Sequence, residues 1–373
     1  MRTGTIVGRF CLGPQIGQGA FGKIFAARDT ETGLLYAIKN ESATAERRTL
    51  IFETKILRRI QSSPYFPRFF DSGQYNSFDW IAMELVGPSI SAVIKHTVLH
   101  KLSISTVIRA SIHALRGIQS LHELGFIHRD IKPANMLIRL SKYPNQPPIC
   151  LIDFGLVRIY RDQKTGQHIK PRPRTGFRGT KTYASLNAHA GNDLSRRDDL
   201  ISWFYFVLDA LLGDLPWKGN EDNTDIAMLK SKYDVKAAVE DVAPQLFDIW
   251  QHITSLNFED DPNYQFILQK LNEIMSDNHI IDDDKYDWDE YMSQYRRQLT
   301  NEFGVALRID GGADIQPYYT ELGVPPTIMK EMSDKKRMYQ PLLQANVPKY
   351  HGKNYSIMQY SELNEKDDKC GCC

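Results

Sequence analysis

Two short polar motifs constrain this chain more than any other feature of its sequence. Residues 128–135 read HRDIKPAN, and an Asp-Phe-Gly triplet begins at Asp153, eighteen residues after Asn135. Transfer of a γ-phosphoryl group needs a carboxylate that orients the attacking hydroxyl, oxygen ligands for Mg²⁺, and cations near the charge that spreads in the transition state. The two motifs supply Asp130, Lys132, Asn135 and Asp153 for these tasks. A chance loop of polar residues would not place so many suitable groups in this order.

A glycine-rich stretch lies near the beginning of the chain. Residues 17–24 read GQGAFGKI and stand between two strand-like runs. By itself this spacing is also typical of plain hairpins and of dinucleotide-binding folds. A strand rather than a helix follows Gly22, which disfavours a dinucleotide-binding unit. Lys39, seventeen residues after Gly22, is placed to reach back to bound phosphates.

The secondary-structure pattern changes from strand-like to helical near residue 88. The strands expected before that point lie within residues 9–40, 69–73 and 80–86, with one helix over residues 45–60. The helical part begins with Ser103 as the expected N-cap. Further helices are expected over residues 196–213, 224–232, 243–256 and 263–275. Apolar periodicity weakens after Tyr291, so the last part of the chain is expected to wrap on the lobes or to be partly disordered.

Together these motifs resemble a eukaryotic protein kinase over residues 8–292. The resemblance implies an α+β fold with two lobes. A small β-rich N-lobe is expected over residues 1–87 and a larger helical C-lobe over residues 88–292. Residues 293–373 lie outside the resemblance and are expected to form an extension.

Three further stretches are similar to one kinase group. Residues 83–89 (MELVGPS) and 183–189 (YASLNAH) resemble the casein kinase I group, in which the YAS stretch stands where most protein kinases have Ala-Pro-Glu. Residues 195–200 (SRRDDL) continue the match. Residues 176–180 (GFRGT), followed by the Asn-Ala-His form of the YAS stretch, resemble most the tau-tubulin kinase branch.

The resemblance assigns catalytic roles residue by residue. It implies that Lys39 holds the α- and β-phosphates of ATP and pairs with a helix carboxylate, for which Glu53 is preferred and Glu46 is the alternative. Asp130 would accept or orient the proton of the substrate hydroxyl, and Lys132 would steady the γ-phosphate.

The implied cofactors are ATP and Mg²⁺. Asn135 and Asp153 are the expected metal ligands. The adenine is expected against the linker over residues 83–87, with hydrogen bonds to the Glu84 carbonyl and the Val86 amide. The full nucleotide site implied by the resemblance comprises Gly17, Gly19, Gly22, Ile24, Ala37, Lys39, Met83, Glu84 and Val86.

Two more residues have roles that only the resemblance suggests. Asp199 would hold the backbone of the catalytic loop from a buried helix, and its neighbour Asp198 is the competing choice. Arg129 would be the partner of an anion on the activation segment.

The activation segment, which the resemblance places between Gly155 and Tyr183, is strongly basic. It carries Arg158, Arg161, Lys164, Lys170, Arg172, Arg174, Arg178 and Lys181 against Asp162 alone. Such a run is either a solvated face or a docking surface for acidic or already phosphorylated substrates. Much of the casein kinase I group has an Arg before the Tyr of the YAS stretch. Thr182 stands there in this chain, so recognition of primed substrates is in question.

The leading functional hypothesis is a serine/threonine protein kinase that uses Mg-ATP on protein substrates, with acidic or microtubule-associated proteins favoured by the resemblance. The main alternative is a catalytically silent pseudokinase scaffold, and a small-molecule kinase is a weaker one. The formal net charge of +1 gives no overall attraction to nucleic acid. No nucleic-acid partner is therefore expected, and the oligomeric state is left open.

The compartment is predicted from cysteines and apolar runs. Cys11 and Cys150 lie in strand-like runs, which favours buried thiols in a reducing, cytoplasmic setting. The longest apolar run, residues 201–208, is far below the length of about 20 residues that a membrane span needs. The first ten residues carry no signal-like apolar stretch and Arg2 follows Met1, so neither secretion nor N-myristoylation is expected.

The sequence closes on KCGCC, with Cys370, Cys372 and Cys373. The order is a poor prenylation box, because Gly371 stands where an aliphatic residue is expected. Clustered cysteines are nevertheless similar to the lipid-modified ends of other proteins. Two acyl or prenyl chains attached to them would suffice for stable membrane anchoring. Membrane contact through these thiols is one hypothesis, and a tail end without function is the other.

Overall fold

The computed structural model describes residues 1–18, 22–45, 48–140, 146–162 and 164–303. All described residues lie in one compact unit. Of the predicted residues, Gly19, Glu46, Cys370, Cys372 and Cys373 fall outside the described part. None of the helices in that part is long and apolar enough to cross a membrane.

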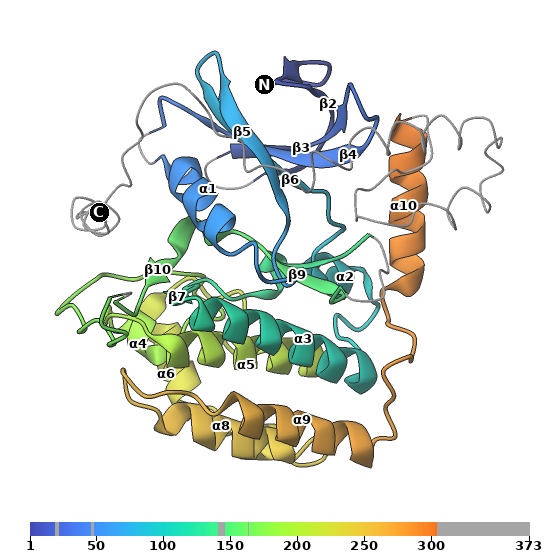
Figure 1. Ribbon diagram of the computed structural model, residues 1–373. Coiled ribbons are helices and arrows are strands. Elements are labelled where there is room, and N and C mark those ends of the chain that lie inside the picture. Colours follow the sequence, from blue (N-terminus) through green and yellow to red (C-terminus); the bar gives the residue numbers. More distant parts are fainter. Residues whose placement is uncertain (19–21, 46–47, 141–145, 163, 304–373) are drawn as a thin grey trace. The chain divides into compact units, whose positions relative to one another are not determined.

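The N-terminal part is a six-stranded antiparallel sheet with one helix (Figure 1). The strands are β1 (Ile6–Val7), β2 (Phe10–Gln18), β3 (Gly22–Asp29), β4 (Leu35–Ser42), β5 (Phe69–Tyr75) and β6 (Phe78–Glu84), in the order β1-β2-β3-β4-β6-β5. The helix is α1 (Thr49–Arg59). Phe10 packs edge-on against Tyr36 and Trp80, at 5.2 and 5.9 Å between ring centroids. These rings form the core of the sheet.

The two internal cysteines differ in burial. Phe10 and Leu12 on β2 are fully buried, and Cys11 between them is only partly buried because successive side chains of a strand point to opposite faces. The expectation that Cys11 is a buried thiol is therefore wrong. Cys150, on the short strand β9 (Ile149–Leu151), is fully buried, as predicted, and burial raises the pKa of its thiol to about 12.

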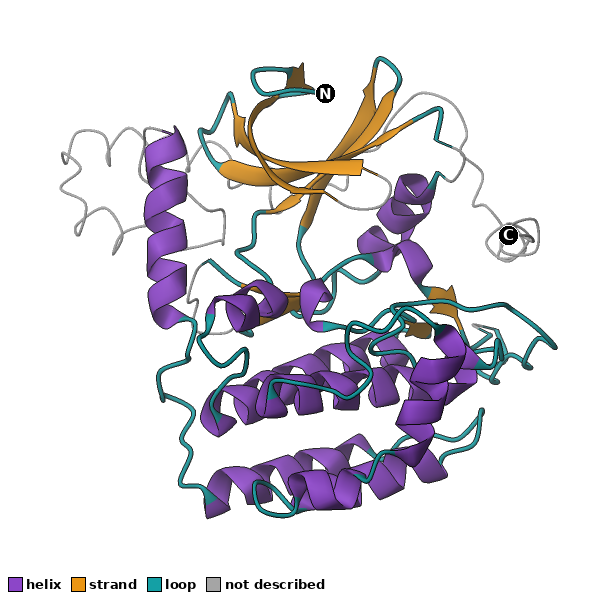
Figure 2. Ribbon diagram, turned by 180° about the vertical axis from the view of Figure 1, so that it is seen from behind, coloured by secondary structure: helices purple, strands orange, loops and turns teal. Residues whose placement is uncertain are grey.

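The C-terminal part is helical. Its helices are α2 (Ile90–His96), α3 (Ile104–Glu123), α4 (Leu186–His189), α5 (Arg196–Leu212), α6 (Asn223–Lys232), α7 (Val235–Val239), α8 (Gln245–Ser255), α9 (Tyr264–Asp277) and α10 (Asp289–Phe303). Two small antiparallel pairs join β7 (Phe126–Ile127) to β10 (Arg158–Ile159) and β8 (Met136–Ile138) to β9. Figure 2 shows α3 and α5 side by side, with α8 and α9 packed below them.

Local sequence explains most of these helices. Ser103 caps α3 by accepting from the Thr106 amide, as predicted, and at the start of α5 the Asp198 side chain accepts from the Ser195 backbone amide. The four other long helices that were expected are present, with ends that differ by a few residues. The short helices α2, α4 and α7 were not expected, because one or two turns carry little periodicity.

Helix α10 crosses the expected boundary between residues 292 and 293. Met292 and Leu299 on this helix are both 2% exposed. Arg296 donates from Nε to the Leu140 carbonyl at 2.8 Å. The helix therefore belongs to the compact unit. The sequence pattern hid it because its buried residues are separated by many polar ones.

Candidate active site

The loop that carries HRDIKPAN connects β7 to β8, and a side chain of α5 binds its backbone. The Asp199 carboxylate accepts from the His128 amide at 2.6 Å, from the Arg129 amide at 2.7 Å and from the His122 ring at 2.9 Å. Arg129 has a φ of 68°, a left-handed conformation. The two hydrogen bonds from the backbone to Asp199 stabilise it. Burial alone would raise the pKa of Asp199, but the hydrogen bonds from His122 and the backbone lower it. The predicted structural use of Asp199 is confirmed.

The competing residue, Asp198, faces a different neighbour. Its carboxylate accepts from the Ser185 hydroxyl at 2.6 Å, the Asn187 amide at 2.9 Å and the Ser195 backbone amide at 2.8 Å. Ser185 and Asn187 belong to the YAS stretch. Asp198 therefore fastens the end of the activation segment to the start of α5.

Asp130 is surrounded by two partners from different segments. The Lys132 ammonium lies 2.7 Å from Asp130 Oδ2, and the Thr180 hydroxyl donates to Asp130 Oδ1 at 2.8 Å. Lys132 also donates to the Thr180 hydroxyl at 2.8 Å. Sequence reasoning used Thr180 only as part of a subfamily marker and missed this contact. A hydroxyl residue late in the activation segment was the available signal.

Asn135 and Asp153 are brought together by their own backbones. The Ile152 amide donates to the Asn135 carbonyl at 3.0 Å, which sets Asp153 beside the loop. The Asn135 side-chain amide donates to the Asp130 carbonyl at 3.0 Å. Because Nδ2 is used as the donor, Oδ1 is the atom that Asn135 can offer to a cation. An amide oxygen and a carboxylate fit the ligand preference of Mg²⁺.

The Asp153 carboxylate is suited to bind a cation. Its side chain is 45% exposed, and its backbone is left-handed, with a φ of 70°. Burial of the group would raise its pKa, but Lys39, His128 and Lys132 lower it below the ordinary value. The carboxylate is therefore ionised at neutral pH.

Lys39 on β4 joins the sheet, α1 and the Asp-Phe-Gly triplet. Its ammonium lies 2.6 Å from the Glu53 carboxylate and 3.4 Å from Asp153. Burial lowers the pKa of Lys39, but Glu53 and Asp153 outweigh this and raise it to about 12. The expected pairing of Lys39 with Glu53 is confirmed.

Of the two described glycines in the glycine-rich stretch, Gly22 stands where a side chain cannot fit. A Cβ on Gly22 would lie 1.7 Å from the Asn40 carbonyl oxygen of the neighbouring strand. Gly17 pairs with Ile24 across the hairpin. Gly22 is therefore required by strand packing, independently of any bound phosphate.

The linker after β6 is tied to the helical part. The buried Glu84 carboxylate forms an ion pair with Arg139, which follows β8. Met83 lies opposite Ala37 in the sheet, and both are buried, as is Val86. These residues stand where the sequence predicts the adenine contact, and their nucleotide-binding role stays a prediction.

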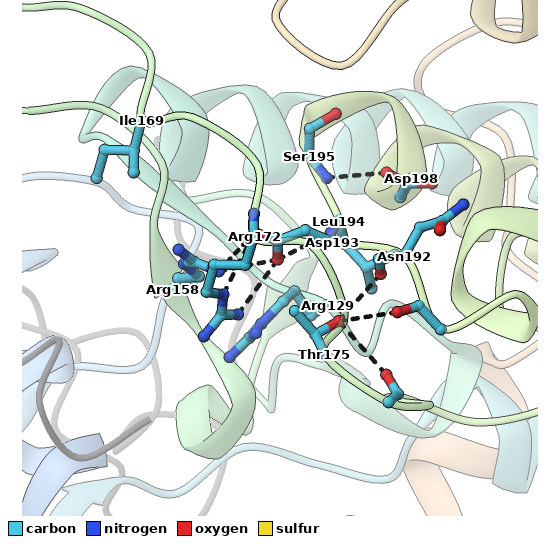
Figure 3. A network of polar contacts seen from close by, with 12 residues as sticks. Arg129, Arg158, Ile169, Arg172, Thr175, Asn192, Asp193, Leu194, Ser195 and Asp198 are labelled. Atoms are coloured by element: carbon cyan, nitrogen blue, oxygen red, sulfur yellow. Dashed lines mark hydrogen bonds and ion pairs between the residues drawn. The ribbon is translucent and has the colours of Figure 1, made fainter. Parts of the chain in front are cut away.

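The activation segment is organised by one buried carboxylate, shown in Figure 3. Asp193 accepts from Arg158 Nη1 at 2.8 Å and from the Arg172 side chain and backbone at 3.2 and 3.0 Å. Nearby, the Thr175 hydroxyl donates to the Asn192 carbonyl at 3.1 Å. Burial would raise the pKa of Asp193, but the hydrogen bonds from Arg172 and the charge of Arg158 lower it.

These contacts divide the basic residues of the segment. Arg158 and Arg172 are bound to Asp193, Arg161 donates to the Glu123 carbonyl, and Lys181 donates to the Glu221 carbonyl. Three others are exposed: Lys164, Lys170 and Arg174. The basic run is thus partly structural and partly a solvent-facing surface.

The chain is similar to known protein kinases. The family model of the protein kinase domain matches residues 10–278. A probable serine/threonine-protein kinase of Dictyostelium discoideum is 37% identical over 285 residues, which cover 76% of this chain and 57% of that protein. The chain thus spans little more than half the length of this curated relative.

Proposed function

Because the chain belongs to the protein kinase family, we propose that it is an active serine/threonine protein kinase that transfers the γ-phosphoryl group of ATP to protein hydroxyls. The observation that carries the proposal is a connected set of side chains. Glu53 holds Lys39, Lys39 contacts Asp153, and Asp130 lies between Lys132 and Thr180.

The proposed roles are those that the resemblance implies, and this geometry supports them. Asn135 and Asp153 would hold Mg²⁺, which neutralises charge on the phosphates when it is bound. Lys39 would bind the α- and β-phosphates, and Lys132 the γ-phosphate. The substrate oxygen forms a bond to the γ-phosphorus as the bond to the β-phosphate oxygen breaks, and ADP leaves. Asp130 orients the attacking hydroxyl and accepts its proton.

A pseudokinase scaffold is the main alternative. Such a protein would not need the Lys39–Glu53 ion pair or an ionised Asp153 beside Lys39, and both are present. Lys132 supports serine and threonine over tyrosine as substrates, because it resembles the lysine that serine/threonine kinases carry at this place. The long segment over residues 155–183 favours a peptide over a small molecule.

The role of Asp130 can be tested by substitution. Replacing it (Asp130→Asn) should lower incorporation of labelled phosphate into casein or tubulin by about 10²- to 10⁴-fold, because the amide cannot accept the hydroxyl proton. The matched control is Asp241→Asn, which changes the same charge at an exposed position. Activity that survives Asp130→Asn, or is equally lost in the control, would remove Asp130 from this role.

We also propose a closer placement within the kinases. The stretches over residues 83–89, 176–180 and 183–189 support the casein kinase I group and the tau-tubulin kinase branch. Exposed Lys164, Lys170 and Arg174 support acidic substrates.

The cysteines at the end of the sequence carry a proposal about location. Cys370, Cys372 and Cys373 are proposed lipidation sites that would place a cytoplasmic enzyme on a membrane. Changing all three to Ser should shift the protein from the membrane fraction to the supernatant on sedimentation of a lysate. Changing Cys11 to Ser serves as the control. Persistent sedimentation of the triple variant with membranes would contradict the proposal.

A further inference from the structure

A buried lysine lies behind the activation segment. Lys230 on α6 is 4% exposed, and its ammonium donates to the Lys181 carbonyl at 2.7 Å and to the Ala184 carbonyl at 2.6 Å. His189 Nε2 lies 3.1 Å away. Lys230 forms no ion pair with another described residue, and burial disfavours its charged form and lowers its pKa to about 7, so these neutral acceptors are what favour the ammonium near neutral pH. The segment itself supplies the acceptors for this charge.

The neighbouring histidine is held in the tautomer that suits a cation. Asn223 donates from Nδ2 to the His189 carbonyl, so its Oδ1 faces His189 Nδ1, at 2.6 Å. An oxygen at that place requires the proton on Nδ1, which leaves Nε2 as an acceptor. Burial lowers the pKa of His189, so the ring is neutral. The three N–H groups of the Lys230 ammonium thus meet three acceptors.

Aromatic rings complete the site. The Lys230 ammonium lies 4.7 Å from the centre of the Tyr205 ring and 5.6 Å from that of Trp217. Ring faces attract cations, most strongly where water is excluded. Trp217 also donates from Nε1 to the Thr182 carbonyl at 2.8 Å. Side chains from α6 and the stretch before it therefore bind the carbonyls of Lys181, Thr182 and Ala184.

These carbonyls belong to a turn that ends at the catalytic carboxylate. The Thr180 carbonyl accepts from the amides of Tyr183 and Ala184, both at 2.9 Å. The hydroxyl of the same Thr180 donates to Asp130 at 2.8 Å. The turn over residues 180–184 is thus fixed to Asp130 at one end and to Lys230 at the other.

We propose that Lys230 is a positioning residue of phosphoryl transfer, whose ammonium sets the turn over residues 180–184 and through it the place of the acceptor peptide beside Asp130. The proposal rests on the proposed kinase function. It assigns Lys230 no contact with ATP or with the reacting atoms. Loss of the ammonium should therefore disturb use of the peptide and leave nucleotide binding intact.

The test compares Lys230→Met with Lys236→Met in the full chain. Methionine keeps the length and apolar stem of lysine but removes the donors, and Lys236 on α7 is exposed. In Lys230→Met, kcat/KM for a peptide substrate should fall about thirtyfold while the KM for ATP changes less than about twofold. Lys236→Met should match the wild type. A second variant, Asn223→Ala, frees the tautomer of His189 without touching the turn and should lower kcat/KM in the same direction by a smaller factor.

Amide exchange gives a readout that does not depend on activity. In Lys230→Met, the Tyr183 and Ala184 amides should exchange about tenfold faster, while amides of β4 keep the wild-type rate. An unchanged turn, a uniform rise that includes β4, or an equal loss of peptide and ATP affinity would overturn the proposal. A wild type that transfers no phosphate would overturn the proposed function instead, and the exchange comparison would still decide whether Lys230 sets the turn.

Discussion

Single residues of the activation segment show how one type of side chain serves two purposes. Arg158 and Arg172 point inward to the Asp193 carboxylate, with 10% and 22% of their side chains exposed. Lys170 and Arg174 are neighbours of Arg172 in sequence but are exposed to solvent. Charged pairs that are partly buried define the fold of the segment, and exposed charges set the field that an approaching substrate meets. Acidic-substrate docking is therefore expected from the second set alone.

The docking surface can be tested by reversing its charge. The double variant Lys170→Glu with Arg174→Glu should lower kcat/KM for an acidic peptide by about tenfold at low ionic strength, because attraction becomes repulsion. The effect should shrink as salt is added. The control, Lys95→Glu with Lys101→Glu, makes the same change in net charge at exposed positions outside the segment. Equal slowing of acidic and neutral peptides would contradict docking at this surface.

At the scale of elements, the activation segment is a loop whose shape is set by a few buried polar groups. Asp193, just before α5, fastens Arg158 on β10 and Arg172 in the middle of the segment. Asp198 binds Ser185 near its end. Loops pay a large entropy cost for order, and these hydrogen bonds to charged groups offset it.

Removal of the Asp193 charge should loosen the segment. In Asp193→Asn the amide group would face an arginine, which should lower the free energy of unfolding by about 3 kcal/mol. Cleavage by trypsin after Lys164 and after Arg174 should be faster, because both are exposed and neither is followed by proline. The control is Asp214→Asn, an exposed position. A cleavage rate equal to that of the wild type would show that Asp193 does not order the segment.

The effect of pH on this variant follows from the pKa of Asp193. Its pKa is lowered in the folded protein, so the carboxylate contributes stability above the unfolded value, about 3.9, and that contribution is lost as the pH falls through the folded pKa. The difference in melting temperature between wild type and Asp193→Asn should therefore be full at neutral pH and shrink in acid. A constant difference down to acid pH would contradict an ionised Asp193.

Across the compact unit, the chain returns to the linker between its strand-rich and helical parts. Asp287 accepts from the backbone and side chain of Ser103 at 2.6 and 2.9 Å, and Tyr291 packs on His96 with 4.7 Å between ring centroids. Met292 lies so close to Gly87 that a Cβ added there would be 2.8 Å from Met292 Cε. Helix α10 thus supports the linker from outside.

Truncation of Met292 should show this support. Met292→Ala should lower the free energy of unfolding by about 2–4 kcal/mol, because a buried side chain is replaced by a cavity. The KM for ATP should rise, since the linker at Gly87 loses its packing. Met228→Ala is the control, because Met228 is 46% exposed. Unchanged melting temperature and KM would show that α10 is only an accessory.

Much of the site was predictable because its signals are local. The order and spacing of Lys39, Asp130, Asn135 and Asp153 were enough to predict the chemistry, and Ser103 marked the start of α3. The strands of the N-terminal sheet followed from alternation and turns. Helix α10 was not predicted and the burial of Cys11 was misjudged, since each depends on which face a distant element covers.

The sequence by itself determined which reactive groups this protein has and the order in which they occur, because each motif lies within a few residues of one chain segment. Only the tertiary structure decided how neighbours differ. Asp198 and Asp199 are adjacent on α5, yet successive helix residues point about 100° apart, so one meets the YAS stretch and the other the catalytic loop. Lys230 follows the same rule, because it becomes a ligand of the activation segment only when α6 packs against α4.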